Sequence, residues 1–194
     1  MTLASCAALV KSAPDAAIAA ANRWTLTGGI DARLCLAQAY VARERWPAAA
    51  AAFGQAAADA VRANDPRAPH LHVQAGNAWL AGDDPRQARA AFDAALALAG
   101  MSDELRGEAL IDRARAHVAA GDLTAARVDL DAGVALVPAD PFGWYASASL
   151  AARAGDLVRA RTDIARAATL APDDAGIKTL SASLAVAATA PSTP

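Results

Sequence analysis

The sequence is poor in lysine, in aromatic residues and in cysteine. Only two of its 18 basic residues are lysine, and aromatic residues make up 5% of the chain. The formal net charge is −2, so the chain lacks the basic footprint that binds nucleic acid or an acidic membrane surface. No apolar run approaches the roughly 18–20 residues that span a bilayer. These absences predict that the chain neither binds nucleic acid nor inserts into a membrane.

The sequence also lacks recognisable catalytic and metal-binding motifs. No HExxH, GxSxG, Walker, GxGxxG or CxxC pattern occurs. His70 and His72 are two residues apart and do not share a helix face, and His117 stands where the repeat described below has a packing residue. Asp84 directly before Pro85 suits a helix cap better than a metal ligand. We therefore expect no catalytic residue, no cofactor and no metal site.

The two cysteines, Cys6 and Cys35, leave two interpretations open. They are either two buried thiols or one disulfide that ties the first helix to the next layer, and a disulfide would imply an oxidising compartment.

Arginine-rich, alanine-rich usage with almost no lysine suggests a high-GC bacterial source. The N-terminus is not a convincing signal peptide. On balance we expect the periplasm or cell envelope, narrowly ahead of the cytoplasm.

Alanine is abundant, with 60 copies in the chain. Alanine is the best helix former, and β-branched and aromatic residues are scarce, so the composition predicts an all-α fold. Gly-Asp-Leu occurs at 121–123 and again at 155–157, and Pro138 and Pro172 are also 34 residues apart. This period is typical of stacked helix–turn–helix units, in which each unit buries its apolar face only against its neighbours.

The repeat resembles the tetratricopeptide repeat (TPR), whose signature is W-x2-L-G-x2-Y, then A-x3-F, then P. The resemblance covers roughly residues 30–172, although Arg33 and His72 replace the signature tryptophan in the first two copies. The A-x3-F element has a counterpart in every copy, with leucine or isoleucine for phenylalanine in the last two: Ala49/Phe53, Ala88/Phe92, Ala126/Leu130 and Ala160/Ile164. The resemblance implies a solenoid: a right-handed superhelix of antiparallel helix pairs.

The expected units follow from this register. They are a divergent N-terminal helix pair at 1–29, four repeats at 30–67, 68–101, 102–139 and 140–172, a C-terminal helix at 173–189 and a flexible tail at 190–194. Small residues are expected where the two helices of a unit cross most closely, namely Ala37, Ala49, Gly76, Ala88, Ala114, Ala126, Ala148 and Ala160. The acidic and basic residues of the second helices, such as Asp129 and Asp163, are expected on a solvated outer face.

The resemblance implies a non-catalytic protein–protein interaction module that binds a partner peptide or helix in its concave groove. The groove positions carried over from the family are Gln38, His70, Val73, Asn77, Ile111, Arg115, Phe142, Tyr145 and Ser149. The repeats contain no lysine, which disfavours the lysine-based carboxylate clamp by which some family members bind chaperone C-termini. The identity of the partner is not evident from the sequence.

Two alternatives remain for function. The chain could be a structural or self-associating domain, or a fragment of a longer array, that uses the apolar C-terminal helix. The residues for such a homodimer contact would be Ile177, Leu180, Leu184 and Val186. A weaker alternative is a carrier of a small ligand, for which the sequence shows no convergent polar pocket.

Overall fold

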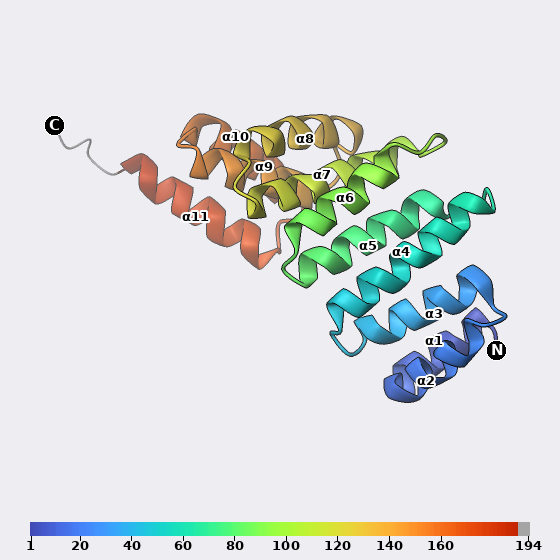
Figure 1. Cartoon of the computed structure of the whole chain (residues 1–194). Helices are drawn as coiled ribbons and strands as arrows, with labels where there is room; N and C mark the ends of the chain where they lie inside the picture. The colour runs from blue at the N-terminus through green and yellow to red at the C-terminus, as the bar shows by residue number, and fades with distance from the viewer. Residues whose placement is uncertain (190–194) are drawn as a thin grey trace. The chain divides into compact units, whose positions relative to one another are not determined.

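The computed structural model describes residues 1–189, which form α-helices joined by turns and contain no strand (Figure 1). The chain divides into two compact units, Met1–Met101 and a second that begins at Ser102. The predicted tail at 190–194 lies outside the described residues. The fold class is therefore the all-α repeat predicted from the sequence.

Within each unit, helices that follow one another in the chain pack side by side as antiparallel pairs (Figure 1). The first unit contains α1 (Leu3–Ser12), α2 (Pro14–Trp24), α3 (Gly29–Val41), α4 (Trp46–Arg62), α5 (Ala68–Ala81) and α6 (Pro85–Leu96). The described part of the second unit contains α7 (Asp103–Ala119), α8 (Leu123–Leu136), α9 (Pro141–Arg153), α10 (Leu157–Leu170) and α11 (Ala175–Thr189).

The repeated Gly-Asp pair makes the turn inside each repeat of the second unit. Gly121 and Gly155 have φ angles of 81° and 80°, in the left-handed region that glycine tolerates without strain. The side chains of Asp122 and Asp156 each accept a hydrogen bond of 3.0 Å from the backbone N–H three residues later. Both aspartates are therefore helix N-caps.

Other helices also begin or end at residues whose side chains act on the neighbouring backbone. Asp84 caps α6 by accepting a hydrogen bond from the N–H of Gln87, and Ser102 caps α7. Helices α8 and α10 end two residues before Pro138 and Pro172. A proline cannot continue a helix, and the residue before it is pushed away from helical geometry.

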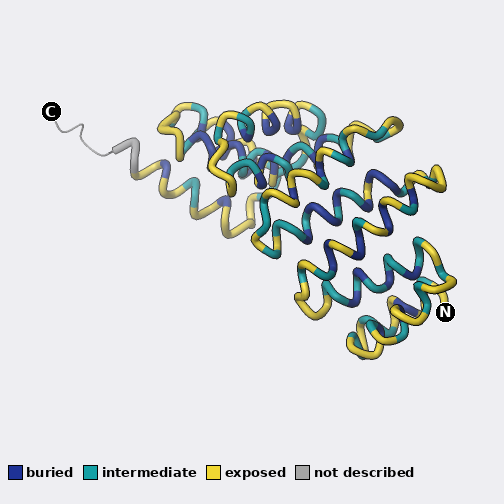
Figure 2. Tube along the Cα trace, viewed as in Figure 1, coloured by how far each residue is buried: buried dark blue, intermediate teal, exposed yellow. Residues whose placement is uncertain are grey.

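The small residues expected at the helix crossings are all buried. This holds for Ala37, Ala49, Gly76, Ala88, Ala114, Ala126, Ala148 and Ala160. A Cβ atom at Gly76 would lie 2.6 Å from the ring of Phe92, so glycine is required where α5 meets α6. Figure 2 shows buried and exposed residues alternating along each helix, as expected for helices with one packed face.

Replacing Ala126 with tryptophan is expected to destabilise the second unit by about 1–3 kcal/mol, because Ala126 is fully buried between packed helices. The measurement is urea unfolding followed by circular dichroism. Ala165→Trp, at an exposed position of α10, is the matched control and should change the midpoint little. Equal midpoints for the two variants would show that the repeat register is wrong.

The carboxylates of Asp129 and Asp163 are buried rather than solvated, which corrects the expectation for the outer face. Their residues are only 5% and 6% exposed. The Arg113 guanidinium donates two hydrogen bonds of 2.7 Å to Asp129, and the Ser147 hydroxyl donates one to Asp163. Both pairs join the first helix of a repeat to its second helix, at positions that correspond through the 34-residue period. The hydrogen-bonding partner of each carboxylate offsets the free-energy cost of its burial.

The apolar face of α11 packs inside the chain, which corrects the expected self-association surface. Ile177 and Leu184 are each 4% exposed, and half-buried Leu180 packs against the same core with residues of α9 and α10. Val186 alone of the four residues is well exposed, at 70%. An apolar side chain already removed from water gains little by moving to another surface, so this face offers no large dimer contact.

Cys6 and Cys35 form a disulfide between α1 and α3. Their Cα atoms are 5.9 Å apart, within the range that a disulfide can bridge. Both residues are fully buried and pack with Ala21 and half-buried Trp24. The bond therefore lies in the core that joins the divergent N-terminal pair to the first repeat.

The surroundings of Asp65, Arg67 and His72 in the first unit shift the pKa values of these groups. Hydrogen bonds from Arg67 lower the pKa of Asp65 to about 2, and Arg67 also donates to Asp31 at the start of α3. Burial lowers the pKa of His72, because the charged imidazolium loses hydration there. Burial therefore favours the neutral form of the His72 imidazole.

Candidate functional site

A cavity of about 410 Å³ lies between α7 and α9 in the second unit. Four of the groove residues predicted from the sequence line it together: Arg115, Phe142, Tyr145 and Ser149. The other lining residues are Ala114, Val118, Ala119, Leu130, Ala146, Leu150 and Arg153. The cavity is therefore mostly apolar, with a small number of polar groups.

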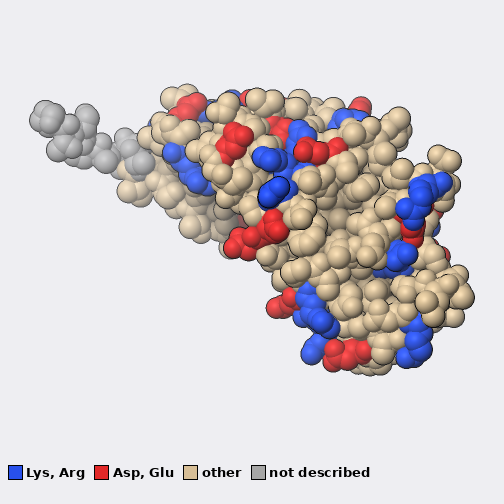
Figure 3. Space-filling model, in the orientation of Figure 1, with Lys and Arg blue, Asp and Glu red and all other residues tan. Residues whose placement is uncertain are grey.

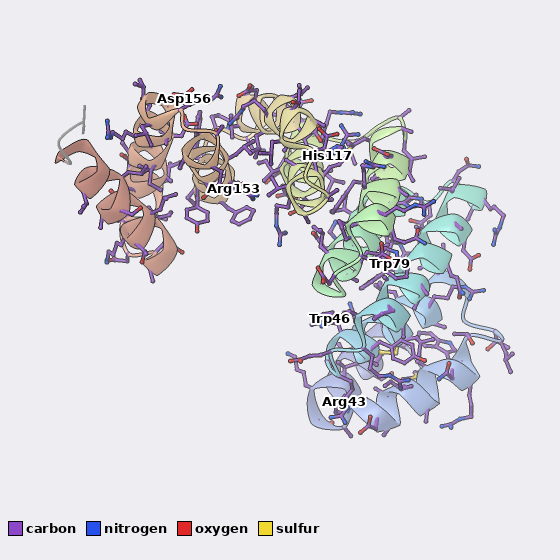
Figure 4. All side chains as sticks on the ribbon, turned by 60° about the vertical axis from the view of Figure 1, so that its left-hand side comes forward. Arg43, Trp46, Trp79, His117, Arg153 and Asp156 are labelled. Atoms are coloured by element: carbon purple, nitrogen blue, oxygen red, sulfur yellow. A yellow bond between two sulfur atoms is a disulfide. The ribbon has the colours of Figure 1, made fainter. Side chains whose placement is uncertain are left out.

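Helix α9 presents its lining residues on a single face. Phe142, Tyr145, Ser149 and Arg153 follow one another at intervals of three and four residues, which places them along one side of a helix. Asp140 fixes the start of this helix by accepting hydrogen bonds from the first backbone N–H groups, at 2.9 and 3.1 Å. The stripe therefore runs from the capped end of α9 to its last turn, where Arg153 lies (Figure 4).

Both charged residues of the lining are arginines. The Arg115 guanidinium carbon lies 5.4 Å from the centre of the Phe142 ring, within cation–π range. Arg115 also donates a 2.9 Å hydrogen bond to Asp112, one turn earlier on α7. Among residues 1–189, the exposed side chain of Arg153 makes neither an ion pair nor a hydrogen bond. The cavity therefore has a positive rim with one cation available to a ligand.

A second hollow, of about 320 Å³, is also lined by Phe142 and Tyr145. It is formed by residues of α9 and by the segment that begins α11, with Asp174 as its only charged lining residue. Asp174 accepts a 2.9 Å hydrogen bond from the N–H of Ile177 and so caps α11. Phe142 and Tyr145 thus line both a hollow with two arginines and a smaller hollow with one aspartate.

Two predicted groove residues are buried instead of facing a groove. Ile111 is 1% exposed because its side chain fills the space left by Gly133 on α8 and Gly143 on α9. A Cβ at either glycine would lie 2.7 Å from the Ile111 side chain. Val73 on α5 is 5% exposed, so this aliphatic side chain too is removed from water. Neither residue can contact a partner directly.

The remaining predicted residues lie in the first unit and line no part of the cavity between α7 and α9. Gln38 on α3 and Asn77 on α5 are half-buried, and His70 is exposed. The Nε2 atoms of His70 and Gln74 are 2.9 Å apart, in a hydrogen bond within α5. The prediction missed Arg153, which lies one turn beyond Ser149 on the same face of α9 and could have been found by that spacing.

Charged groups of both signs are interspersed on the face of the molecule drawn in Figure 3. In the described part of the chain, no group of three or more histidine, cysteine or acidic residues is placed to hold a metal ion. None of the helices described here combines the length and apolar character needed to cross a membrane.

Comparison with known proteins identifies the fold. No protein-family model matches the sequence, and no curated protein matches it. Among solved structures, the APC/C heterotetramer Cut9–Hcn1 superposes with a TM-score of 0.58 and 14% identity over 94% of this chain. The TPR2AB domain of yeast Sti1 in its pHSP90 complex is 18% identical, with a TM-score of 0.43, over 95% of this chain and 82% of its own.

The fold is that of a TPR-type helical-repeat array, in agreement with the resemblance read from the sequence. At these identities the likeness concerns the fold and not the activity. The chain spans 42% of the length of the Cut9–Hcn1 chain that it matches.

Proposed function

We propose that the protein is a non-catalytic protein–protein interaction module and that the cavity between α7 and α9 receives a segment of its partner. The observation that carries this proposal is the convergence of Arg115, Phe142, Tyr145 and Ser149 on one apolar cavity. The TPR register alone predicts that these four residues lie in a groove. The proposed role involves no chemical step.

The physical character of the cavity supports a role in binding. Phe142 is 43% exposed, although an aromatic side chain of this size gains free energy when it is buried. Exposed aromatic residues and arginines beside a concave apolar surface are typical of the residues that dominate protein interfaces. A partner that covers Phe142 and Tyr145 would bury apolar surface and place a polar or acidic group near Arg153.

The test is affinity capture from the native host followed by measurement of binding to the purified partner. Ser149→Trp should fill the cavity and weaken partner binding by at least about tenfold, or 1.4 kcal/mol. The matched control is Ser183→Trp on α11, because Ser183 is an exposed helical serine of the same unit and does not line the cavity.

The comparison of Ser149→Trp with Ser183→Trp is valid when circular dichroism shows that both variants remain helical. A partner bound equally well by the wild type and both variants would contradict the cavity as the binding site. Capture of no protein by the wild type would count against the interaction role itself.

We also propose that the protein resides in an oxidising compartment, with the bacterial periplasm or cell envelope as the favoured location. The Cys6–Cys35 pairing supports this, because structural disulfides persist mainly outside reducing cytosol. Protein isolated from its native host without reductant should then show no free thiol after denaturation. Two free thiols would overturn the proposed location.

A further inference from the structure

Building on the proposed role of the cavity, we propose that its occupant is an acidic amphipathic helix of the partner protein. The apolar face of this helix would lie against Phe142 and Tyr145, and an aspartate or glutamate about two turns away would pair with Arg153. The proposal depends on three properties of the cavity: the few hydrogen-bonding groups in its lining, the length of its α9 stripe and the sign of its charges.

The lining favours a helix over an extended peptide. The backbone N–H and C=O groups in the middle of α7 and α9 are used by their own helices, and most of the lining side chains are alanine, valine, leucine or phenylalanine. An extended peptide would need hydrogen-bond partners for its backbone, and leaving those groups buried without partners is costly. A helix satisfies its own backbone and can present only side chains to an apolar surface.

The length of the stripe sets the spacing of the contacts. From Phe142 to Arg153 the stripe extends about 16 Å along α9, at 1.5 Å per residue, which corresponds to three helical turns. Tyr145 and Arg153 are separated by about 12 Å along the same axis. An apolar anchor over Tyr145 and a carboxylate at Arg153 therefore fit positions i and i+7 or i+8 of a bound helix.

The charges of the lining favour an acidic occupant. The cavity contains Arg115 and Arg153 and no acidic residue. Arg115 already shares its charge with Asp112, whereas Arg153 has no ion-pair partner among the described residues. A carboxylate brought to Arg153 would form a charge-assisted hydrogen bond, and a lysine or arginine at the same place would meet like charge.

The experiment uses a phage library of random 16-residue peptides fused through their C-termini, so that none has a free terminal carboxylate. The library is selected on the whole chain and counter-selected on Ser149→Trp. Peptides that distinguish the two proteins are synthesised with blocked ends, and their binding is measured by fluorescence anisotropy. The expected peptides carry an apolar residue and an aspartate or glutamate seven or eight positions apart.

Two further measurements separate this proposal from simple apolar binding. Arg153→Glu should weaken these peptides about tenfold, and replacing the peptide's acidic residue with arginine should restore binding to that variant. Arg166→Glu is the control, because Arg166 is exposed on α10 and does not line the cavity. A proline in the middle of the peptide should abolish binding by breaking the helix.

The possible negative results of the peptide selection lead to different conclusions. One such result is a set of peptides that bind the wild type but not Ser149→Trp and yet are basic, or tolerate the central proline. Such peptides would overturn the acidic-helix proposal but would still support the cavity as the interaction site. If no peptide distinguishes the wild type from Ser149→Trp, then both the helix proposal and the proposed function of the cavity are wrong.

Discussion

Removal of the Cys6–Cys35 disulfide is expected to lower the stability of the first unit by about 3–4 kcal/mol. The two cysteines are 29 residues apart in sequence, and a cross-link over a loop of this length restricts the unfolded chain by about that amount in the loop-entropy account. The loss should concentrate at the N-terminal end of the unit, where α1 packs against α2 and α3. In a repeat array, a terminal unit that loses its disulfide cross-link unfolds before the other units.

The measurement is urea unfolding of the oxidised protein and of Cys6→Ala/Cys35→Ala, followed by circular dichroism and by tryptophan fluorescence. Alanine is used because a buried serine hydroxyl would add a polar penalty unrelated to the cross-link. Trp24, one of the four tryptophans, packs in the same small core as the disulfide, so part of the fluorescence change reports on this region. A variant that unfolds at the same urea concentration as the oxidised wild type would show that the disulfide contributes no stability.

The elements of the fold could be predicted because their signals are local. The Gly-Asp turns, the aspartate caps and the prolines after α8 and α10 act within a few residues of themselves. The repeat register, with a spacing of 34 residues in the second unit and longer spacings before it, then relates one helix pair to the next. The small residues that this register aligns are those that the structure buries. These features depend on chain geometry and not on details of packing.

The site could be predicted only in part, because the exposure of a helical residue depends on its neighbours. Ile111 has a groove-facing place in the register, but Gly133 and Gly143 leave space that its side chain fills. The sequence pattern predicts an apolar face on α11, but it does not say whether such a face packs on its own chain or on another. Ile177 and Leu184 show that here it packs on its own chain.

Asp129 illustrates the same difficulty for charge. A helix rich in aspartate and arginine is usually solvated, and nothing in the local sequence distinguishes Asp129 from exposed Asp131 two residues later. The difference arises from Arg113 on the neighbouring helix, whose guanidinium holds Asp129 in a bidentate pair. Such pairs become visible only when two helices have been placed side by side.

Replacing Asp129 with asparagine is expected to destabilise the second unit by about 3 kcal/mol. Asp129 is 5% exposed, and the change removes the negative charge that compensates the Arg113 guanidinium across the helix pair. The new amide also brings N–H donors toward a group that can only donate, so one of the two hydrogen bonds cannot be replaced. Urea unfolding of the whole chain measures the loss.

Asp163→Asn is the matched comparison, because Asp163 occupies the corresponding position of the next repeat and is equally buried. Its nearest partner is the neutral Ser147 hydroxyl, which can donate to an amide oxygen as it does to the carboxylate. Its contact with Arg159 is longer, at 3.4 Å, and lies at a more exposed guanidinium. We therefore expect Asp163→Asn to cost about 1 kcal/mol, the size of a weakened neutral hydrogen bond. Equal losses for the two variants would show that the charge of Asp129, and hence its pairing with Arg113, is not what stabilises this repeat.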